Sequence, residues 1–140
     1  MEHFVLDASV AVAWIVPHVE QELPNSVRER LLAGDRALVP PIWILEVVSA
    51  MKRAIRRGMV TQAMAENGLQ QLSRLFTGSP RIAIADGFTR VHDAYQMTLE
   101  HEVSVYDGCY LDLAMRERMR LATIDEGLRR AAEQAGVGLI

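Results

Sequence analysis

The sequence predicts an α/β fold with a mostly parallel central sheet, built as a single domain over residues 1–140. Short apolar runs of three to five residues alternate with longer segments that carry helix start and stop signals. That alternation is typical of layered α/β proteins. The chain has 140 residues and contains no linker, low-complexity tract or strong repeat. One domain with a real hydrophobic core is therefore expected.

The first half of the chain contains three predicted helices and two strands. Residues 3–7 contain the apolar run 4–6 and are predicted to form a strand. Asp7 or Ser9 can cap the helix that follows, and Pro17 ends it. The later boundaries are set by glycine and proline. In order, these signals predict a strand at 3–7, a helix at 10–16, a loop at 24–25, a helix at 26–33 stopped by Gly34, a strand at 37–39 closed by Pro40 and Pro41, and a helix at 42–57 stopped by Gly58.

The second half continues the same alternation. Thr61 is a good helix cap, and the turn at residues 78–80 separates its helix from the next strand. The remaining apolar runs are short enough to be buried strands. In order, the second half is predicted to contain a helix from Thr61 to about Phe76, a strand at 81–85, helices at 88–101 and 106–119, a strand at 121–124, a helix at 126–135 and a terminal strand at 137–140.

Composition places the chain among soluble globular proteins, because 50% of its residues are hydrophobic and 24% are charged. The apolar run at 8–16 is too short to span a bilayer, and no basic segment precedes it. Neither a membrane span nor a signal peptide is predicted. The single Cys109 excludes an internal disulfide and a cysteine-rich zinc site, so a reducing cytoplasm is expected. A net charge of −3 leaves room for local basic stripes that contact phosphates.

Two acidic residues follow apolar strands. Asp7 is the only charged residue in the segment 4–16, and Asp125 ends the apolar run 121–124 in the same way. An isolated carboxylate in such surroundings is costly unless something pairs with it. In open α/β sheets this edge is also where ligands bind. The alternative for both residues is a helix N-cap, a common role for Asp after a strand.

Two further acidic residues lie near the starts of predicted helices. Glu46 is the only charge in the segment 41–51 and lies past the first helical turn, so capping does not explain it. Asp107 has apolar residues three, four and seven positions ahead, although a role at the positive end of the helix dipole is an alternative. Both side chains can turn towards the strand ends.

Together, Asp7, Glu46, Asp107 and Asp125 predict a metal site. Hard oxygen ligands without His or Cys suit Mg²⁺ or Mn²⁺. Such metals activate water and offset charge on a phosphoryl group that undergoes displacement. The histidines lack the spacing of metal ligands and receive no role: His3, His18, His92 and His101.

These motifs resemble the PIN domain, and most closely the small single-domain PIN ribonucleases of toxin–antitoxin systems, the VapC-like toxins. The matching segments are residues 5–9, 41–47, 106–114 and 122–128. Each segment alone is a weak signal, since it is only a carboxylate in an apolar frame. Four of them in this order, spread over nearly the whole chain, are specific.

The resemblance implies a three-layer α/β/α fold in which the four carboxylates hold one or two Mg²⁺ or Mn²⁺ ions. It also implies cleavage of RNA by a metal-dependent endoribonuclease, a cognate antitoxin as partner, and a homodimer. Ser9 and Thr123 match hydroxyl positions that support the site, where they can hydrogen-bond a carboxylate. Backbone capping is the alternative for both hydroxyls.

Two surfaces are predicted less directly. Lys52, Arg53, Arg56 and Arg57 follow Glu46 on one predicted helix and can steer RNA towards the metal. The alternative is a solvated helix end, where cations are favoured. Four apolar residues of the two middle predicted helices could line a groove that binds the antitoxin. The alternative is that these side chains belong to the hydrophobic core. The residues in question are Trp43, Val47, Leu69 and Leu72.

Three other functions compete with this interpretation. A phosphatase of haloacid-dehalogenase type also begins with a strand that ends in Asp, but it needs a second Asp where this chain has Ser9. A receiver-like Mg²⁺-binding module needs a late lysine, and the only lysine is Lys52. The third alternative is a non-catalytic PIN-like module that only binds a partner, against which the complete acidic set argues.

Overall fold

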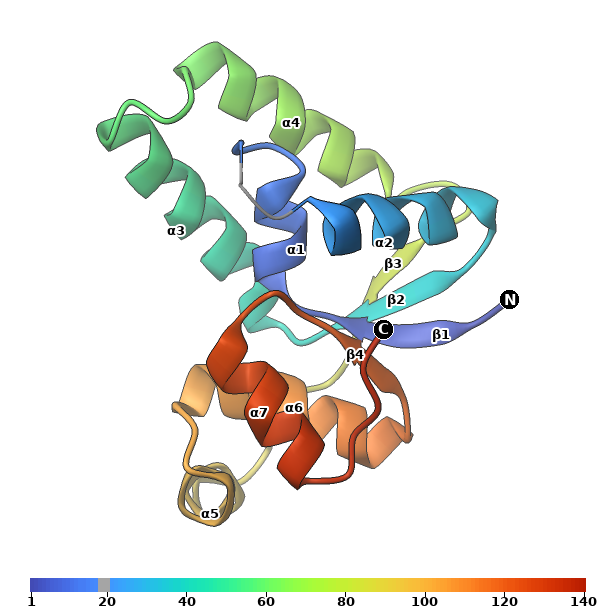
Figure 1. The fold of residues 1–140 in the computed structure, drawn as a ribbon, viewed down its shortest axis with the longest axis vertical. Helices are drawn as coiled ribbons and strands as arrows, with labels where there is room; N and C mark the ends of the chain where they lie inside the picture. The colour runs from blue at the N-terminus through green and yellow to red at the C-terminus, as the bar shows by residue number, and fades with distance from the viewer. Residues whose placement is uncertain (18–20) are drawn as a thin grey trace.

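The computed structural model describes residues 1–17 and 21–140, and His18 lies outside them. Four strands of the described part form one sheet in the order β3-β2-β1-β4, and every neighbouring pair is parallel. The predicted α/β fold with a parallel sheet is therefore confirmed (Figure 1). The strands are β1 (His3–Leu6), β2 (Arg36–Val39), β3 (Ile82–Ile84) and β4 (Arg120–Ala122).

Helices cover both faces of the sheet and complete three layers (Figure 1). The chain moves from β1 to β3 in one direction across the sheet and then returns past β1 to add β4. Because parallel crossovers share one hand, this reversal places the later helices on the opposite face. One face carries α1 (Ala8–Ala13), α2 (Glu22–Ala33), α3 (Ile42–Arg56) and α4 (Gln62–Arg74), and the other carries α5 (Val91–His101), α6 (Val105–Glu117) and α7 (Glu126–Gln134).

The main hydrophobic core surrounds the two inner strands. Phe4, Val5 and Leu6 of β1 have no exposed surface. A strand buried on both faces needs apolar residues throughout, which explains why β1 is a continuous apolar run rather than an alternating one. The sheet therefore holds the end of β1 rigidly, and Asp7 follows at that end.

Helices α3 and α4 extend from the sheet as an arm (Figure 1). A second apolar cluster joins this α3–α4 arm to the segment after α1: Val16, Met51, Ala54, Val60 and Ala65. A Cβ atom on Gly68 would lie 2.7 Å from the side chain of Ile15. Glycine is therefore what allows α4 to pack this closely on the segment after α1.

Several predicted boundaries were wrong. Helix α2 begins at Glu22 rather than at residue 26, with Pro24 in its first turn. Proline is tolerated there because the first backbone N–H groups of a helix have no partner within the helix. Helix α1 ends at Ala13 rather than at 16, and α5 begins at Val91 rather than at 88.

The predicted terminal strand at 137–140 is also wrong, since this segment contributes only an isolated bridge between Leu139 and Leu121. Gly136, with a φ of 76°, and Gly138 interrupt it, and glycine weakens strands. None of the helices in the described ranges 1–17 and 21–140 is both long and apolar enough to pass through a membrane.

Candidate active site

Two of the predicted acidic residues lie where the strand order of the sheet reverses. Strands β1 and β4 are neighbours, and Leu6 is paired with Ala122 at their carboxyl ends. Asp7 follows β1 directly, and Asp125 follows β4 after two residues. The crevice outside such a reversal is the usual ligand site of open α/β sheets.

Asp7 is buried, with 6% of its surface exposed, and its side chain is held by two hydroxyl groups. Ser9 Oγ donates to Asp7 Oδ2 at 2.5 Å, and Thr123 Oγ1 donates to the same oxygen at 2.7 Å. Asp7 occupies the N-cap position of α1, but its side chain makes no capping hydrogen bond. Capping is therefore not the main role of this carboxylate, whose two side-chain partners are hydroxyl groups. Burial raises the pKa of Asp7, and the negative charge of Asp125 raises it further, against the effect of the two hydroxyl bonds.

Ser9 and Thr123 support the carboxylate and also bind the backbone. Ser9 Oγ accepts from the N–H of Ile124 at 3.3 Å, and Thr123 Oγ1 accepts from the N–H of Asp125 at 3.0 Å. Each hydroxyl thus bonds both to the carboxylate of Asp7 and to a backbone N–H group. The carbonyl oxygen of Thr123 also accepts from Arg129 Nη1 at 3.1 Å, which ties α7 to the end of β4.

Glu46 projects from α3 and is half-buried. Its Oε1 accepts a hydrogen bond of 2.6 Å from the hydroxyl of Tyr110 in α6. Burial raises the pKa of Glu46 and so does the charge of Asp7, while the bond from Tyr110 and the charge of Arg53 oppose the rise.

Tyr110 is a site residue to which the sequence analysis gave no role. Its side chain is fully buried, and its hydroxyl also accepts from the N–H of Ala8 at 3.4 Å. The hydroxyl therefore links Glu46 to the backbone that follows Asp7. The only signal in the sequence was its position three residues after Asp107, which places both on one side of a helix.

Asp107 lies in the first turn of α6, whose N-cap is Ser104. Burial raises the pKa of Asp107 to about 6, and the charges of Asp125, Asp7 and Glu46 add to the rise. A favourable helix dipole would lower this pKa, so the dipole is not the dominant influence. The negative charges of all three other predicted carboxylates therefore act on Asp107.

Asp125 is exposed and caps α7, because its Oδ1 accepts from the N–H of Leu128 at 2.8 Å. The capping alternative is therefore correct for this residue. Its charge nevertheless raises the pKa of both Asp7 and Asp107. The structure thus brings the four carboxylates into one electrostatically coupled group.

This carboxylate group has little compensation from cations. Within residues 1–17 and 21–140, no salt bridge includes Asp7, Glu46, Asp107 or Asp125. Nor does any group of three or more His, Cys, Asp or Glu side chains in these ranges have an arrangement that could hold a metal ion. The donor chemistry fits a hard divalent cation, because repelling oxygen ligands gain most from a shared positive charge. As they lie in this structure, the four carboxylates do not form such an arrangement.

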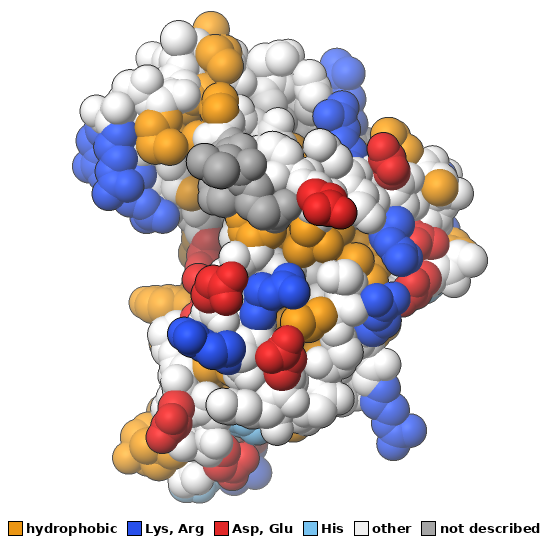
Figure 2. All heavy atoms as spheres, in the orientation of Figure 1, with side chains coloured by type: hydrophobic (Ala, Val, Ile, Leu, Met, Phe, Trp, Pro, Cys, Tyr) orange, Lys and Arg blue, Asp and Glu red, His pale blue; other side chains and the backbone are white. Residues whose placement is uncertain are grey.

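The four predicted basic residues are all exposed on the α3–α4 arm. Figure 2 shows blue side chains gathered on that arm, above a hollow at the left edge with red side chains below it. Arg53 Nη1 donates to Ser49 Oγ at 2.9 Å, and its charge lowers the pKa of Glu46. Arg53 and Arg57 line a hollow with Ser9, whereas Lys52 and Arg56 lie exposed on the same helix.

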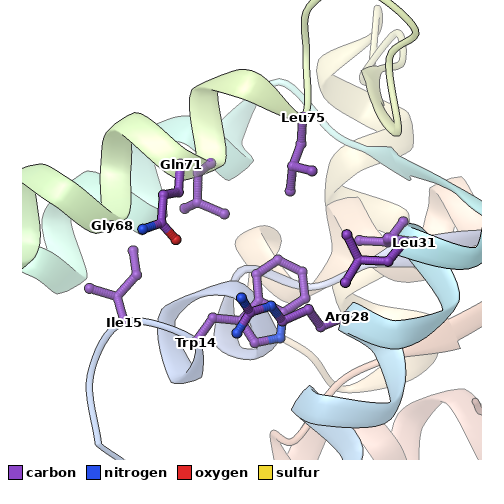
Figure 3. Close-up of a pocket in the computed structure, with 9 residues that line it drawn as sticks. Trp14, Ile15, Arg28, Leu31, Gly68, Gln71 and Leu75 are labelled. Carbon is purple, nitrogen blue, oxygen red and sulfur yellow. The ribbon is translucent and has the colours of Figure 1, made fainter.

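The predicted apolar groove is partly wrong. Trp43 and Val47, each 2% exposed, and Leu72, 6% exposed, are core residues that pack in the main hydrophobic cluster. Leu69 is half-buried, and Leu72 lies at a hollow between α2 and α4 that Figure 3 shows. Other lining residues of this α2–α4 hollow, which has a volume of about 150 Å³, are Trp14, Ile15, Arg28, Leu31, Leu32, Gln71 and Leu75.

Comparisons with known proteins agree with this architecture. Residues 4–134 match the sequence profile of the PIN domain. The chain is 30% identical over 125 residues to Ribonuclease VapC3 from Pyrobaculum aerophilum, a match that covers 89% of this chain and 90% of that protein. It also resembles the crystal structure of PAE2754 from Pyrobaculum aerophilum, with a TM-score of 0.70 over 94% of this chain and 79% of that one, at 18% identity. The structural match at this identity concerns the fold.

Proposed function

The chain belongs to the PIN domain family, and from that premise we propose that it is an Mg²⁺- or Mn²⁺-dependent endoribonuclease that hydrolyses RNA phosphodiester bonds. The observation that carries the proposal is the coupled group of Asp7, Glu46, Asp107 and Asp125 at the carboxyl edge of the sheet. The similarity to a protein named as a ribonuclease supports the choice of RNA as substrate.

The four carboxylates are the proposed metal ligands. When bound there, the metal would activate water and offset the charge that develops on the phosphoryl oxygens and the leaving 3′-oxygen. Asp7 is fixed by Ser9 and Thr123, and Glu46 is fixed by Tyr110. These hydrogen bonds restrict how each of the two carboxylates can turn, which is the role of supporting groups around a metal.

Asp107 is the proposed acceptor of the proton from the attacking water. In the metal-free chain, burial and the neighbouring carboxylates raise the pKa of Asp107 to about 6. A bound cation would lower this pKa, so Asp107 would be ionised and able to accept a proton. Within the described residues, no side-chain hydrogen bond is among the influences on the pKa of its carboxylate. The exposed cations of α3, Lys52, Arg53, Arg56 and Arg57, would contact RNA phosphates and attract the substrate.

The cellular role that we propose is the toxin of a toxin–antitoxin pair, acting in the cytoplasm as a homodimer. The resemblance to VapC-like toxins supports this role, as does the name of the relative. The cognate antitoxin would place an apolar segment in the α2–α4 hollow between Trp14, Leu31 and Leu75 (Figure 3). Arg28 at the same hollow would favour an acidic residue on that segment.

Two of the alternatives are weakened. The family match argues against a haloacid-dehalogenase phosphatase, and Ser9 replaces the second Asp that such an enzyme needs while supporting Asp7. A non-catalytic PIN-like module would have no need for four mutually repelling carboxylates, which cost stability in the absence of a ligand.

RNA cleavage with Mg²⁺ or Mn²⁺ tests the proposal. We expect the wild type to cleave, Asp7→Asn and Asp125→Asn to lose activity, and a chelator to abolish it. Asp93→Asn is the matched control, since Asp93 is an exposed acid that pairs with Arg90 at 3.9 Å on α5. Equal activity in all variants, or cleavage that resists chelation, would refute the proposed chemistry.

Expression in a bacterial host tests the toxin role separately. The wild-type chain should arrest growth, and Asp7→Asn should not, at equal protein levels. Growth that continues despite active ribonuclease would contradict the toxin role and leave the enzyme activity intact.

A further inference from the structure

We propose that Arg129 is a positioning residue, which holds Thr123 in the place where it aligns Asp7 and Asp125. Arg129 lies in α7, one turn after Asp125, and its Nη1 donates a hydrogen bond of 3.1 Å to the carbonyl oxygen of Thr123. The consequence for RNA cleavage rests on the proposed ribonuclease function, whereas the hold on Thr123 does not.

The carbonyl group of Thr123 lies beyond the end of β4. That strand ends at Ala122, whose carbonyl oxygen accepts from the N–H of Asp7 at 3.0 Å. Thr123 has no exposed surface, so bulk solvent does not reach its carbonyl oxygen. Within residues 1–17 and 21–140, no backbone N–H donates to this oxygen. Because an unpaired buried carbonyl is costly, the guanidinium of Arg129 supplies the partner that the sheet does not.

Thr123 joins two of the four acidic residues through its hydroxyl group. Its Oγ1 donates to Asp7 Oδ2 at 2.7 Å and accepts from the N–H of Asp125 at 3.0 Å. Both bonds depend on the orientation of Thr123, which the bond from Arg129 to its carbonyl oxygen restricts. A turn of Thr123 would therefore move Asp7 and Asp125 relative to each other. Small displacements of this kind lower a reaction rate even when the substrate still binds.

Arg129 acts through this hydrogen bond rather than as a counter-ion for the acidic group. In the part of the chain that the structure describes, no salt bridge includes Arg129. Its charge is also not among the influences on the pKa of Asp107. A guanidinium that donates to a carbonyl oxygen makes a charge-assisted bond, which is stronger than a neutral one. The loss of this bond is therefore expected to loosen Thr123 and to leave the charge of the acidic group unchanged.

Steady-state cleavage of RNA by the full chain with Mg²⁺ tests the effect on catalysis. Arg129→Met removes the donors and keeps a long side chain on α7. We expect kcat to fall by about 10-fold, the lower end of the effect of groups that support a metal ligand. KM should stay unchanged, because no contact to RNA is altered. Arg129→Lys should recover part of the rate, since its ammonium group can donate to the same oxygen.

Arg130→Met is the matched control, because Arg130 is the next residue of α7 and is exposed. Its kcat and KM should equal those of the wild type. Circular dichroism should show that every variant is folded, and Arg129→Ala replaces Arg129→Met if the latter does not fold.

The NMR signal of the Asp125 amide proton measures the hold on Thr123 in the metal-free chain, without any cleavage. This N–H donates to Thr123 Oγ1, and a weaker hydrogen bond moves an amide proton upfield. We expect an upfield shift in Arg129→Met, a return towards the wild-type position in Arg129→Lys, and no shift in Arg130→Met. The amide protons of β1 should keep their positions in all variants, because the sheet is not altered.

Three results would overturn the positioning role. The first is a wild-type kcat in Arg129→Met. The second is a raised KM with an unchanged kcat, which would mean that Arg129 contacts RNA rather than positioning Thr123. The third is an Asp125 amide signal that stays in place in Arg129→Met, which would mean that Thr123 is held without Arg129.

The two proposals fail in different ways. If the wild-type chain cleaves RNA with Mg²⁺ and Arg129→Met keeps the same kcat, only the positioning role is wrong. If the wild type does not cleave RNA, the ribonuclease function is wrong, and the amide signal of Asp125 still decides whether Arg129 holds Thr123.

Discussion

The junction between β1 and α1 and the junction between β4 and α7 have the same sequence pattern and different side-chain chemistry. In each, an apolar strand is followed by an Asp and then by a helix. Asp7 is 6% exposed, makes no cap, and accepts hydrogen bonds from two hydroxyl groups. Asp125 is exposed and caps its helix through the N–H of Leu128.

The difference arises from the position of each strand in the sheet. Strand β1 has a neighbour on each side, whereas β4 is paired with β1 alone among the strands of the described part. The flanking elements bury Asp7 and supply Thr123 from the end of β4, so its carboxylate turns away from the helix that it precedes. A similar local pattern therefore produces a buried, directed carboxylate at an inner strand and a helix cap beside β4.

The largest expected effect separates activity from stability at the β1–α1 junction. Asp7→Asn should lower RNA cleavage by at least about 10²–10³-fold, comparable to the loss of one transition-state contact. Its free energy of unfolding at neutral pH should stay equal or rise, because the amide oxygen can still accept from Ser9 and Thr123 without a buried charge. Urea denaturation and cleavage rates measure both. A large loss of stability would show that the charge of Asp7 is structurally required.

A smaller effect should follow from removing the hydroxyl that links Glu46 to this junction. Tyr110→Phe leaves Glu46 and the N–H of Ala8 without their hydrogen bond. We expect Mn²⁺ affinity to fall by about 10- to 100-fold, as for other supporting groups around a metal. Isothermal titration calorimetry gives the affinity directly, with Tyr95→Phe as the control. Unchanged binding would mean that Tyr110 does not position Glu46 for the metal.

The pH dependence of stability should reveal the repulsion among the four carboxylates. The pKa of Asp107 is about 6 in the folded chain, against an ordinary value of 3.8, so the folded state holds its proton over that interval while the unfolded state releases it. The contribution of Asp107 to stability is thus full below pH 3.8 and is lost as the pH rises through about 6. The raised pKa values of Asp7 and Glu46 act in the same direction.

Melting temperatures of metal-free protein from pH 4 to 8 check this sign. Glu2 and Asp35 have lowered pKa values and act in the opposite direction, so the wild type must be compared with Asp107→Asn. The variant should gain stability over the wild type as the pH rises, and Mg²⁺ should restore the wild type above pH 6. A difference that shrinks with rising pH would contradict the coupling.

The smallest expected effect tests the cap at the β4–α7 junction. Asp125→Ala should lower the free energy of unfolding by about 1 kcal/mol, the typical cost of a lost N-cap. Asp125→Asn should cost less, because its amide oxygen can still accept from the N–H of Leu128. Urea denaturation resolves the two variants. If both lose equal stability, the charge rather than the cap supports α7.

The sequence by itself determined the alternation of strands and helices, the burial of β1, and the four acidic positions along the chain. These properties depend on local patterns, since apolar runs and capping residues act over a few positions. Local patterns also led to wrong boundaries. Pro24 indicated a loop, but α2 begins at Glu22, because the first turn of a helix accepts proline.

Only the tertiary structure decided what the site residues contact. Asp7 and Thr123 are 116 positions apart, and Glu46 and Tyr110 are 64 apart, so no local pattern can pair them. It also decided that Trp43 and Val47 are core while Leu45 and Tyr106 are exposed beside Glu46. The physical reason is that hydrogen-bond partners and burial depend on which strands and helices become neighbours, and the order of the sheet sets those neighbours.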